Sequence, residues 1–265
     1  MRIAKIILLP FLTLPSLPST TAEIFSTSFK NPSSNAAISP STNPFQSVRW
    51  FPDPIYQSQV QSSLSLLSAS QSPLLPAAKV AQTAATPLWV ASEEAAQKNL
   101  TEHLRAARKW GRNGGGGGVE NGPVLVQLIV YNLPDRDCSA AASEGDLKIS
   151  DGGEERYRKF IEGIAETLWR YPDLRVVVTL EPDAIPNMVT NAGDPNSKCG
   201  KAKPVQLNLI AYAIKTLTLP NLRVYLDFGH SGWLGWSGNQ DSALNLLESL
   251  ATLLPTSPIP PAFYN

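Results

Sequence analysis

Four apolar segments, each followed by a polar stretch and an amphipathic one, limit most strongly what this chain can fold into. Residues 124–131, 174–180 and 222–226 are continuous apolar runs with many branched side chains, as in strands buried on both faces. A shorter run at 87–90 comes first. Because strands that alternate with helices pair in parallel, the pattern predicts an α/β fold with a parallel sheet.

Helical spacing of apolar residues fills most of the chain between these runs. Asp151 and Glu154 resemble a capping box at the start of one helix, and Pro204 suits the first turn of another. The long polar stretches 132–153 and 181–203 are expected to be loops. Helices are predicted at residues 57–70, 100–110, 154–168, 204–217 and 241–254.

Two architectures fit this alternation, a doubly wound sheet and a (β/α) barrel. No GxGxxG motif follows the strand at 124–131, so a nucleotide-binding sheet loses its main support. We therefore favour a barrel. A closed barrel has about eight strand–helix units, and only four are visible here.

The N-terminal residues resemble an export signal. Arg2 and Lys5 precede an apolar run, and small residues follow up to about Ala22. The run is too short to span a bilayer, so we expect secretion rather than a membrane anchor. An ordinary disordered N-terminus is the alternative. The expected organisation is a signal peptide at 1–22, a Ser/Pro-rich arm at 23–56, a partial catalytic domain at 57–254 and a Pro-rich tail at 255–265.

Charge and cysteine content narrow the function classes. The chain has 22 Lys and Arg residues against 22 Asp and Glu residues, a balance that disfavours nucleic acid and polybasic membrane contacts as partners. Neutral polysaccharides and many small molecules remain compatible. Cys138 and Cys199 would usually pair in an exported chain, although two free buried thiols are the alternative. Neither metal-ligand spacing nor a CxxC motif is present, so we expect no metal and no cofactor.

Acidic residues follow three successive predicted strands. Asp137, Asp183 and Asp227 lie at the carboxyl ends, where parallel α/β folds build their active sites. A single such Asp would be read as a helix cap or turn residue. Three of them favour acid–base chemistry, because one carboxylate can raise the pKa of a neighbouring acid. Glycosidic bond cleavage requires such an acid.

Aromatic residues near the same strand ends could contact sugar rings. Trp89 lies at the first strand, and Trp233 and Trp236 follow the fourth. Tryptophans are as often core residues as binding platforms. His230 fits a polar site residue, with a hydrogen-bonded core histidine as the alternative.

These same segments resemble a known family. Residues 131–138, YNLPDRDC, with 143–145, SEG, resemble the first signature of glycoside hydrolase family 6. Residues 177–183, VVTLEPD, resemble its second signature, and 225–236, YLDFGHSGWLGW, its third conserved block. Order and spacing match throughout, from about residue 43 to about residue 250.

The resemblance implies a distorted seven-stranded barrel and hydrolysis of β-1,4-glucan with inversion. It implies that Asp183 is the general acid and that Asp137 tunes its pKa. Ser143 is expected to help hold the catalytic water, and Cys138 and Cys199 match the family's first disulfide. Residues that would bind substrate or support the site are Tyr131, Arg136, Ser143, Asp227, His230, Trp89, Trp233 and Trp236.

The resemblance stops before the chain ends. The family's catalytic domain continues with further strands and its proposed base aspartate, whereas residues 255–265 are Pro-rich and unlike it. We therefore expect a barrel truncated after about four strand–helix units. An inactive remnant that at most binds glucan is the alternative to a glucanase, and another barrel enzyme is a remote third. No carbohydrate-binding module is visible.

Overall fold

The computed structural model describes residues 36–39, 41, 43–66, 75–115, 122–140 and 143–254. The predicted signal peptide and the Pro-rich tail lie outside these residues, as does the first part of the predicted arm. The three domain boundaries predicted from composition therefore stay predictions.

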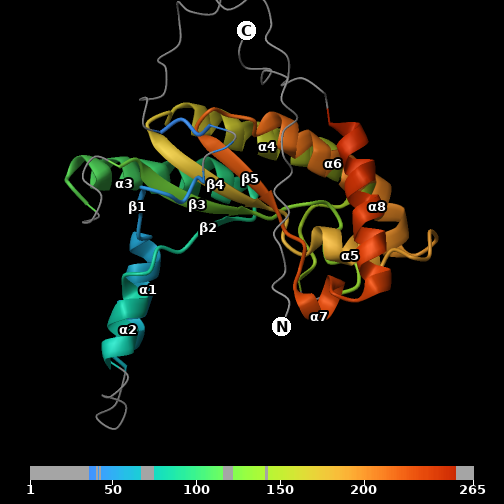
Figure 1. Ribbon diagram of the computed structural model, residues 1–265, viewed down its shortest axis with the longest axis horizontal. Coiled ribbons are helices and arrows are strands. Elements are labelled where there is room, and N and C mark those ends of the chain that lie inside the picture. The colour runs from blue at the N-terminus through green and yellow to red at the C-terminus, as the bar shows by residue number, and fades with distance from the viewer. Residues whose placement is uncertain are drawn as a thin grey trace, which may run out of the picture.

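The strands form one parallel sheet, which confirms the α/β class (Figure 1). Its order is β1-β3-β4-β5, and β2 also pairs with β3. β1 lies beside the start of β3 and β2 beside its end, so the two short strands share one edge. Among the described residues the sheet is open, as expected for a partial barrel. The strands are β1 (Arg49–Trp50), β2 (Leu88–Val90), β3 (Val124–Val130), β4 (Leu174–Leu180) and β5 (Leu222–Leu226).

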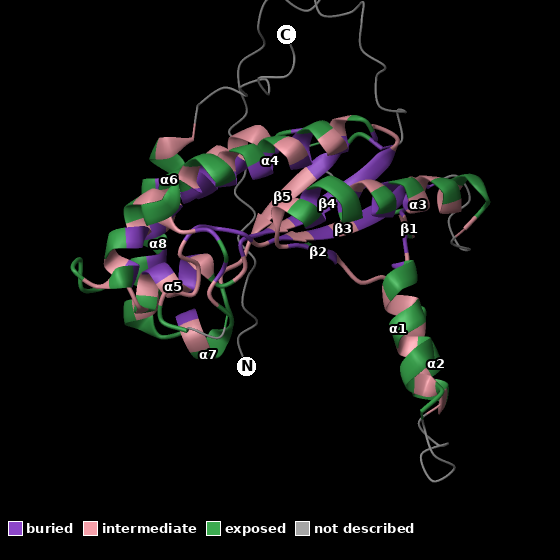
Figure 2. Ribbon diagram, turned by 180° about the vertical axis from the view of Figure 1, so that it is seen from behind, coloured by how far each residue is buried: buried purple, intermediate pink, exposed green. Residues whose placement is uncertain are grey.

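Helices connect the strands. A π-helical turn, Ala95–Asn99, leads into α3, and a 3-10 turn, Ile149–Asp151, precedes α4. In both Figure 1 and Figure 2 the hairpin of α1 and α2 extends away from the sheet, and neither helix buries a residue. The helices are α1 (Pro54–Leu64), α2 (Leu75–Gln82), α3 (Leu100–Arg112), α4 (Gly153–Trp169), α5 (Ala184–Thr190), α6 (Lys198–Thr216), α7 (Ser231–Leu234) and α8 (Ser237–Leu253).

The main core lies on one face of the sheet. Side chains alternate along a strand, so Val126, Val176 and Val178 point to the same face, where they are fully buried. Leu104 from α3 and Ile161 from α4 belong to the same cluster. Full burial of each such side chain contributes roughly 1.5–3 kcal/mol. This packing fixes the strands and therefore the row of residues at their carboxyl ends.

The opposite face is covered less completely. Leu125 and Val177 are buried beneath Val48 in a small separate cluster. Trp50 and Trp89, which share this face by register, remain 42% and 53% exposed. The prediction of strands buried on both faces is therefore only partly correct for the described residues.

Three local predictions were wrong. The predicted loop 181–203 contains α5 and the start of α6, which Ser197 caps by accepting a 2.9 Å hydrogen bond from Gly200 N. Pro204 lies inside α6, since one missing donor is outweighed by the remaining helical bonds of that long helix. The start of α4 has no capping box, because Gly152 takes the left-handed conformation there (φ 66°).

Candidate active site

The strand ends form one row across the sheet. Val90 pairs with Val130, Val130 with Leu180, and Leu180 with Leu226. The next residues continue the register: Tyr131 N donates to Val90 O at 3.1 Å, and Glu181 N donates to Val130 O at 2.7 Å. Asp227 is the residue directly after Leu226. Parallel pairing thus brings together residues that lie far apart in the sequence.

Four acidic residues at these ends have left-handed backbones. Asp135 and Asp137 have φ of 52° and 50°, and Glu181 and Asp183 have φ of 46° and 64°. Glycine is the residue best suited to such positions. Strained backbone conformations of residues other than glycine cluster at functional sites, which indicates that these four carboxylates belong to such a site.

Asp137 is held by two neighbours. Tyr131 donates its hydroxyl proton to Asp137 Oδ2, and Asn187 Nδ2 donates to Oδ1 at 3.1 Å. The Arg136 guanidinium lies over the Tyr131 ring, with Cζ 3.8 Å from the ring centroid, and also donates to the Tyr131 carbonyl. Burial and the bond to Asp137 raise the pKa of the Tyr131 hydroxyl, which therefore keeps its proton. Tyr131, Arg136 and Asp137 form one connected unit.

Asp183 is exposed and lies beside the two other predicted carboxylates. Its backbone N–H donates to Asp227 Oδ2 at 2.8 Å. Partial burial raises the pKa of the Asp183 carboxyl, the charge of Asp227 raises it further, and that of Asp137 adds a smaller effect. His230 acts in the opposite direction. The larger carboxylate effect thus comes from Asp227, and the effect of Asp137, which was predicted to tune this pKa, is smaller.

The predicted aromatic residues lie on two sides of these carboxylates. Trp89 packs edge-on against Tyr131, with ring centroids 5.8 Å apart. Trp233 Nε1 donates to Thr190 Oγ1 on α5 at 3.1 Å, and Trp236 is 70% exposed. His230 Nδ1 accepts a 3.2 Å hydrogen bond from Gly232 N at the start of α7, so it is an exposed cap and not a core histidine.

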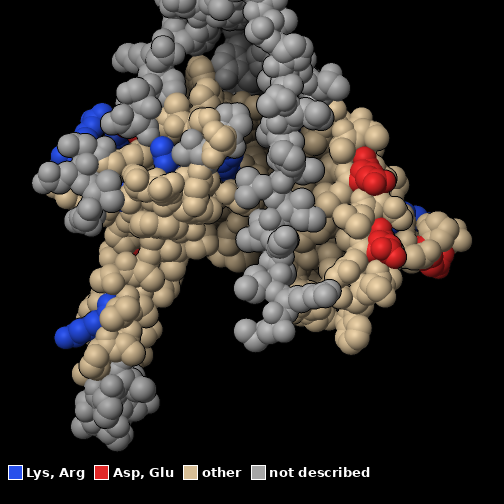
Figure 3. Space-filling view, viewed as in Figure 1, with Lys and Arg blue, Asp and Glu red and all other residues tan. Residues whose placement is uncertain are grey.

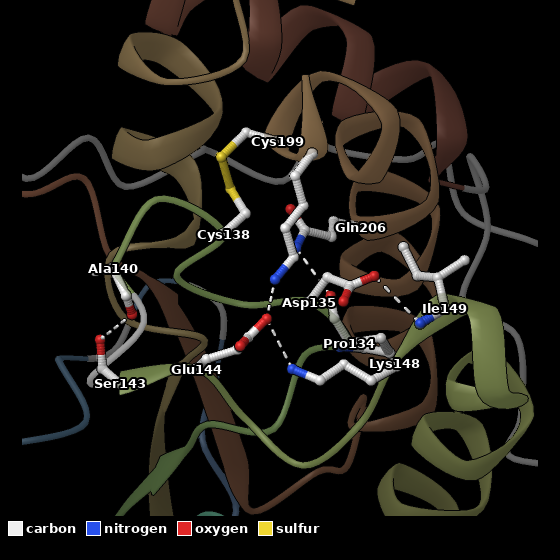
Figure 4. A network of polar contacts seen from close by, with 11 residues as sticks. Pro134, Asp135, Cys138, Ala140, Ser143, Glu144, Lys148, Ile149, Cys199 and Gln206 are labelled. Carbon is white, nitrogen blue, oxygen red and sulfur yellow. Dashed lines mark hydrogen bonds and ion pairs between the residues drawn. A yellow bond between two sulfur atoms is a disulfide. The ribbon is translucent and has the colours of Figure 1, made fainter. Parts of the chain in front are cut away.

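The β3 loop, defined here as residues 131–140, is fixed to α6. Cys138 and Cys199 form the predicted disulfide, with Cα atoms 5.2 Å apart. Gln206 Nε2 donates to Pro134 O at 2.9 Å (Figure 4). Glu144, just beyond the loop, forms ion pairs with Lys148 and Lys198. The carboxylate of Asp137 therefore belongs to a loop that a disulfide and a hydrogen bond hold against α6.

Ser143 and Trp236 are predicted site residues that no described contact brings to the carboxylates; Trp236 Nε1 donates to Gly232 O at 3.3 Å. Ser143 Oγ donates to Ala140 O at 3.4 Å, within its own turn (Figure 4). The expected role of Ser143 in holding water stays a prediction.

Two residues of the site were missed by the sequence reasoning. Glu181, only 1% exposed, accepts bonds from Asn132 N, Leu133 N and the Tyr157 hydroxyl. A carboxylate directly after an apolar strand was a signal for it. Asn187 gave no signal, because it lies on α5, within the segment expected to be a loop.

The described residues contain no cluster of His, Cys, Asp and Glu that could hold a metal ion. Within the same part of the chain, no helix has the length and apolar character needed to cross a membrane.

The fold and the site together define an α/β protein with a carboxylate site at the ends of parallel strands. The sequence profile described as Glycosyl hydrolases family 6 matches residues 45–253. The chain belongs to this family.

Individual relatives agree. The chain is 40% identical over 207 residues to 1,4-beta-D-glucan cellobiohydrolase C of Emericella nidulans, covering 78% of this chain and 44% of the relative. It is 38% identical over 212 residues to exoglucanase 2 of Hypocrea jecorina, covering 79% of this chain and 42% of the relative. The chain therefore spans less than half the length of these relatives.

Solved structures show the same fold. Cellobiohydrolase II from Humicola insolens, in complex with glucose and cellotetraose, superposes with a TM-score of 0.72 at 32% identity, covering 80% of this chain and 56% of that one. The catalytic core domain of the cellobiohydrolase from Chaetomium thermophilum gives a TM-score of 0.72 at 33% identity, with the same coverage.

Proposed function

We propose that this protein hydrolyses β-1,4-glucosidic bonds in cellulose or cello-oligosaccharides with inversion of configuration, with Asp183 as the general acid. The observation that carries the proposal is the position of Asp183: it lies at the row of strand ends, where partial burial and the charges of Asp227 and Asp137 raise the pKa of its carboxyl group. An acid that retains its proton near neutral pH can give it to a leaving group. The names of the relatives, which are cellobiohydrolases, support the same substrate class.

The proposed reaction has one chemical step. Asp183 gives its proton to the glycosidic oxygen as the bond from that oxygen to the anomeric carbon breaks. A water attacks the anomeric carbon from the opposite face of the sugar and passes its proton to the surrounding water, which gives the inverted product. Partial burial and the charges of Asp227 and Asp137 raise the pKa of Asp183, which favours its protonated form, and Tyr131 and Arg136 hold Asp137 in place.

The aromatic residues and the surface charge suit a neutral, extended substrate. Trp89, Trp233 and Trp236 offer ring faces and edges around the carboxylates, and sugar C–H groups pack on such surfaces. On the face shown in Figure 3, most of the described surface is uncharged. A secreted protein that acts on an insoluble glucan outside the cell fits the export signal expected at 1–22.

A glucan-binding protein without turnover is the second candidate. Ser143 favours it, because this predicted water-holding residue bonds within its own turn. Such a protein would keep the tryptophans and Asp183 but would not position water. Turnover separates the two candidates, since both would bind glucan.

The test is hydrolysis of cellotetraose by the whole chain, with Asp183→Ala as the variant and Asp241→Asn as the control. Asp241 is an exposed aspartate on α8, and it contributes to no part of the proposed site. We expect turnover by the unsubstituted chain and by the control, and loss of at least about 10³-fold in the Asp183 variant. Glucan binding without turnover by the unsubstituted chain would establish the second candidate instead.

A further inference from the structure

Glu181 is a buried carboxyl group for which the proposed reaction has no use. Both of its oxygens accept from Asn132 N at 3.1 Å, Oε2 also accepts from Leu133 N at 3.0 Å, and Oε1 accepts from Tyr157 Oη at 2.9 Å. Asn132 and Leu133 directly follow Tyr131 in the β3 loop. Glu181 itself lies two residues before Asp183. The Glu181 side chain thus links the segment that carries Asp183 to the loop that carries Asp137.

The backbone of Glu181 is shaped for this contact. Strand alternation would place its side chain on the face of Thr179 and Tyr225. Its left-handed φ of 46° turns it instead toward α4, where it meets Tyr157 among the residues of the main core. A glycine would adopt this conformation with less strain, but it would leave the two loop N–H groups without this acceptor.

The charge of Glu181 also bears on the β3 loop. The pKa of this carboxyl is raised to about 7. Burial is the cause, and it outweighs the donors Asn132, Tyr157 and Leu133 and the charge of Arg136, all of which lower the pKa. Tyr157 from α4 and Arg136 from the β3 loop are the ionisable groups that face it. Glu181, Arg136, Tyr131 and Asp137 line one pocket. In the protonated form the carboxyl can still accept both loop N–H groups through Oε2 and donate to the Tyr157 oxygen.

We propose that Glu181 is a positioning residue whose carboxyl group holds the β3 loop, and with it Asp137, against the segment that carries Asp183. Its importance for catalysis rests on the proposed function, but its hold on the loop does not. If the loop opens, Glu181 reaches water and recovers its ordinary, lower pKa. The closed loop therefore binds the proton more tightly, so a rise in pH through about 7 favours opening.

Hydrogen exchange of the whole chain tests this without any need for turnover. The readout is the protection of peptides from residues 131–140, corrected for the intrinsic effect of pH, with peptides from β4 as internal reference. In the unsubstituted chain we expect protection of the β3 loop to fall at least tenfold between pH 5 and pH 8, while β4 stays protected.

Two substitutions separate the effect of Glu181 as a hydrogen-bond acceptor from the effect of its charge. Glu181→Ala removes the acceptor for both loop N–H groups, so we expect at least tenfold faster exchange of the β3 loop already at pH 5. Glu181→Gln mimics the protonated form, so it should keep the loop closed and remove the pH dependence. Glu144→Gln is the matched control, a carboxylate lost beside the same loop, and should leave the pH dependence as in the unsubstituted chain.

Exchange of the β3 loop in Glu181→Ala at the unsubstituted rate would overturn the proposal. So would Glu181→Gln with the pH dependence intact. If Glu181→Ala fails to fold, seen as rapid exchange of β4, the pH comparison between Glu181→Gln and the unsubstituted chain decides alone. Because no arm measures hydrolysis, failure of the proposed function would leave these results standing, and the reverse also holds.

Discussion

Two regions at the same edge of the sheet are held in place very differently. The β3 loop is fixed by a disulfide, by Gln206 and by the buried carboxyl group of Glu181. The β5 segment, defined as residues 227–236, is mostly exposed and is held by hydrogen bonds near the surface, such as that from Trp233 to Thr190. The comparison shows two ways of placing site residues: the β3 loop holds its carboxylate rigidly, whereas the β5 segment leaves Trp236 and His230 exposed at the surface.

Loss of the disulfide should have the largest effect on stability. Replacing Cys138 and Cys199 by Ser removes a link across 61 residues, so we expect a loss of about 4 kcal/mol in the free energy of unfolding. Urea unfolding of the double variant measures it. Equal protection of the β3 loop in the oxidised and double-variant proteins would show that the disulfide does not restrain this loop.

The next effect is a pH dependence of stability that comes from Glu181. Its pKa is raised from 4.5 to about 7 in the folded protein, so the folded state keeps a proton that the unfolded state loses. The stabilisation is full below about pH 4.5 and is lost as the pH rises through about 7, by up to about 3 kcal/mol. Urea unfolding at pH 5 and pH 8 should show this slope, and Glu181→Gln should reduce it. An unchanged slope in the variant would contradict the assignment.

A charge change on the β5 side should act on acidity and not on stability. Asp227→Asn keeps an oxygen for the Asp183 N–H but removes the charge that raises the pKa of Asp183. The pKa of Asp183 should fall, so the basic limb of the pH–rate profile should move down by up to about one pH unit. Asp137→Asn should move it less. A larger shift in the Asp137 variant would reverse the order of the two carboxylates.

The smallest effect is expected for the ion pairs at the edge of the β3 loop. Glu144 and Lys198 are both partly exposed, and such pairs contribute about 1 kcal/mol or less. Glu144→Gln should therefore change the free energy of unfolding by no more than that. A loss above about 2 kcal/mol would mean that this network, and not Glu181, is the main restraint on the loop.

The strands were predictable because burial dictates their composition. The continuous apolar runs 174–180 and 222–226 match β4 and β5 to the residue. β1 and α5 were missed, since a two-residue strand has no periodicity and α5 lies in a polar, Pro-containing stretch. Strong apolar patterning predicts the long strands of the sheet, whereas the short helices and strands around the site depend on tertiary contacts that the sequence pattern does not show.

The carboxylates show the same division. Asp137, Asp183 and Asp227 could be identified from their places after strands, and the structure brings them to one edge. The direction of the Glu181 side chain could not, because a left-handed backbone reverses the alternation that sequence reasoning assumes. Nor could the larger effect of Asp227 on Asp183, which depends on distances in space.

The most direct test of the proposed mechanism compares two leaving groups in the Asp183→Ala variant. Cellotetraose needs a proton on its leaving oxygen, whereas a dinitrophenyl cellobioside does not. The account predicts that the variant loses at least about 10³-fold in turnover of cellotetraose and far less with the dinitrophenyl substrate. Equal losses on both substrates, or retention of most turnover on cellotetraose, would contradict the assignment of Asp183 as the general acid.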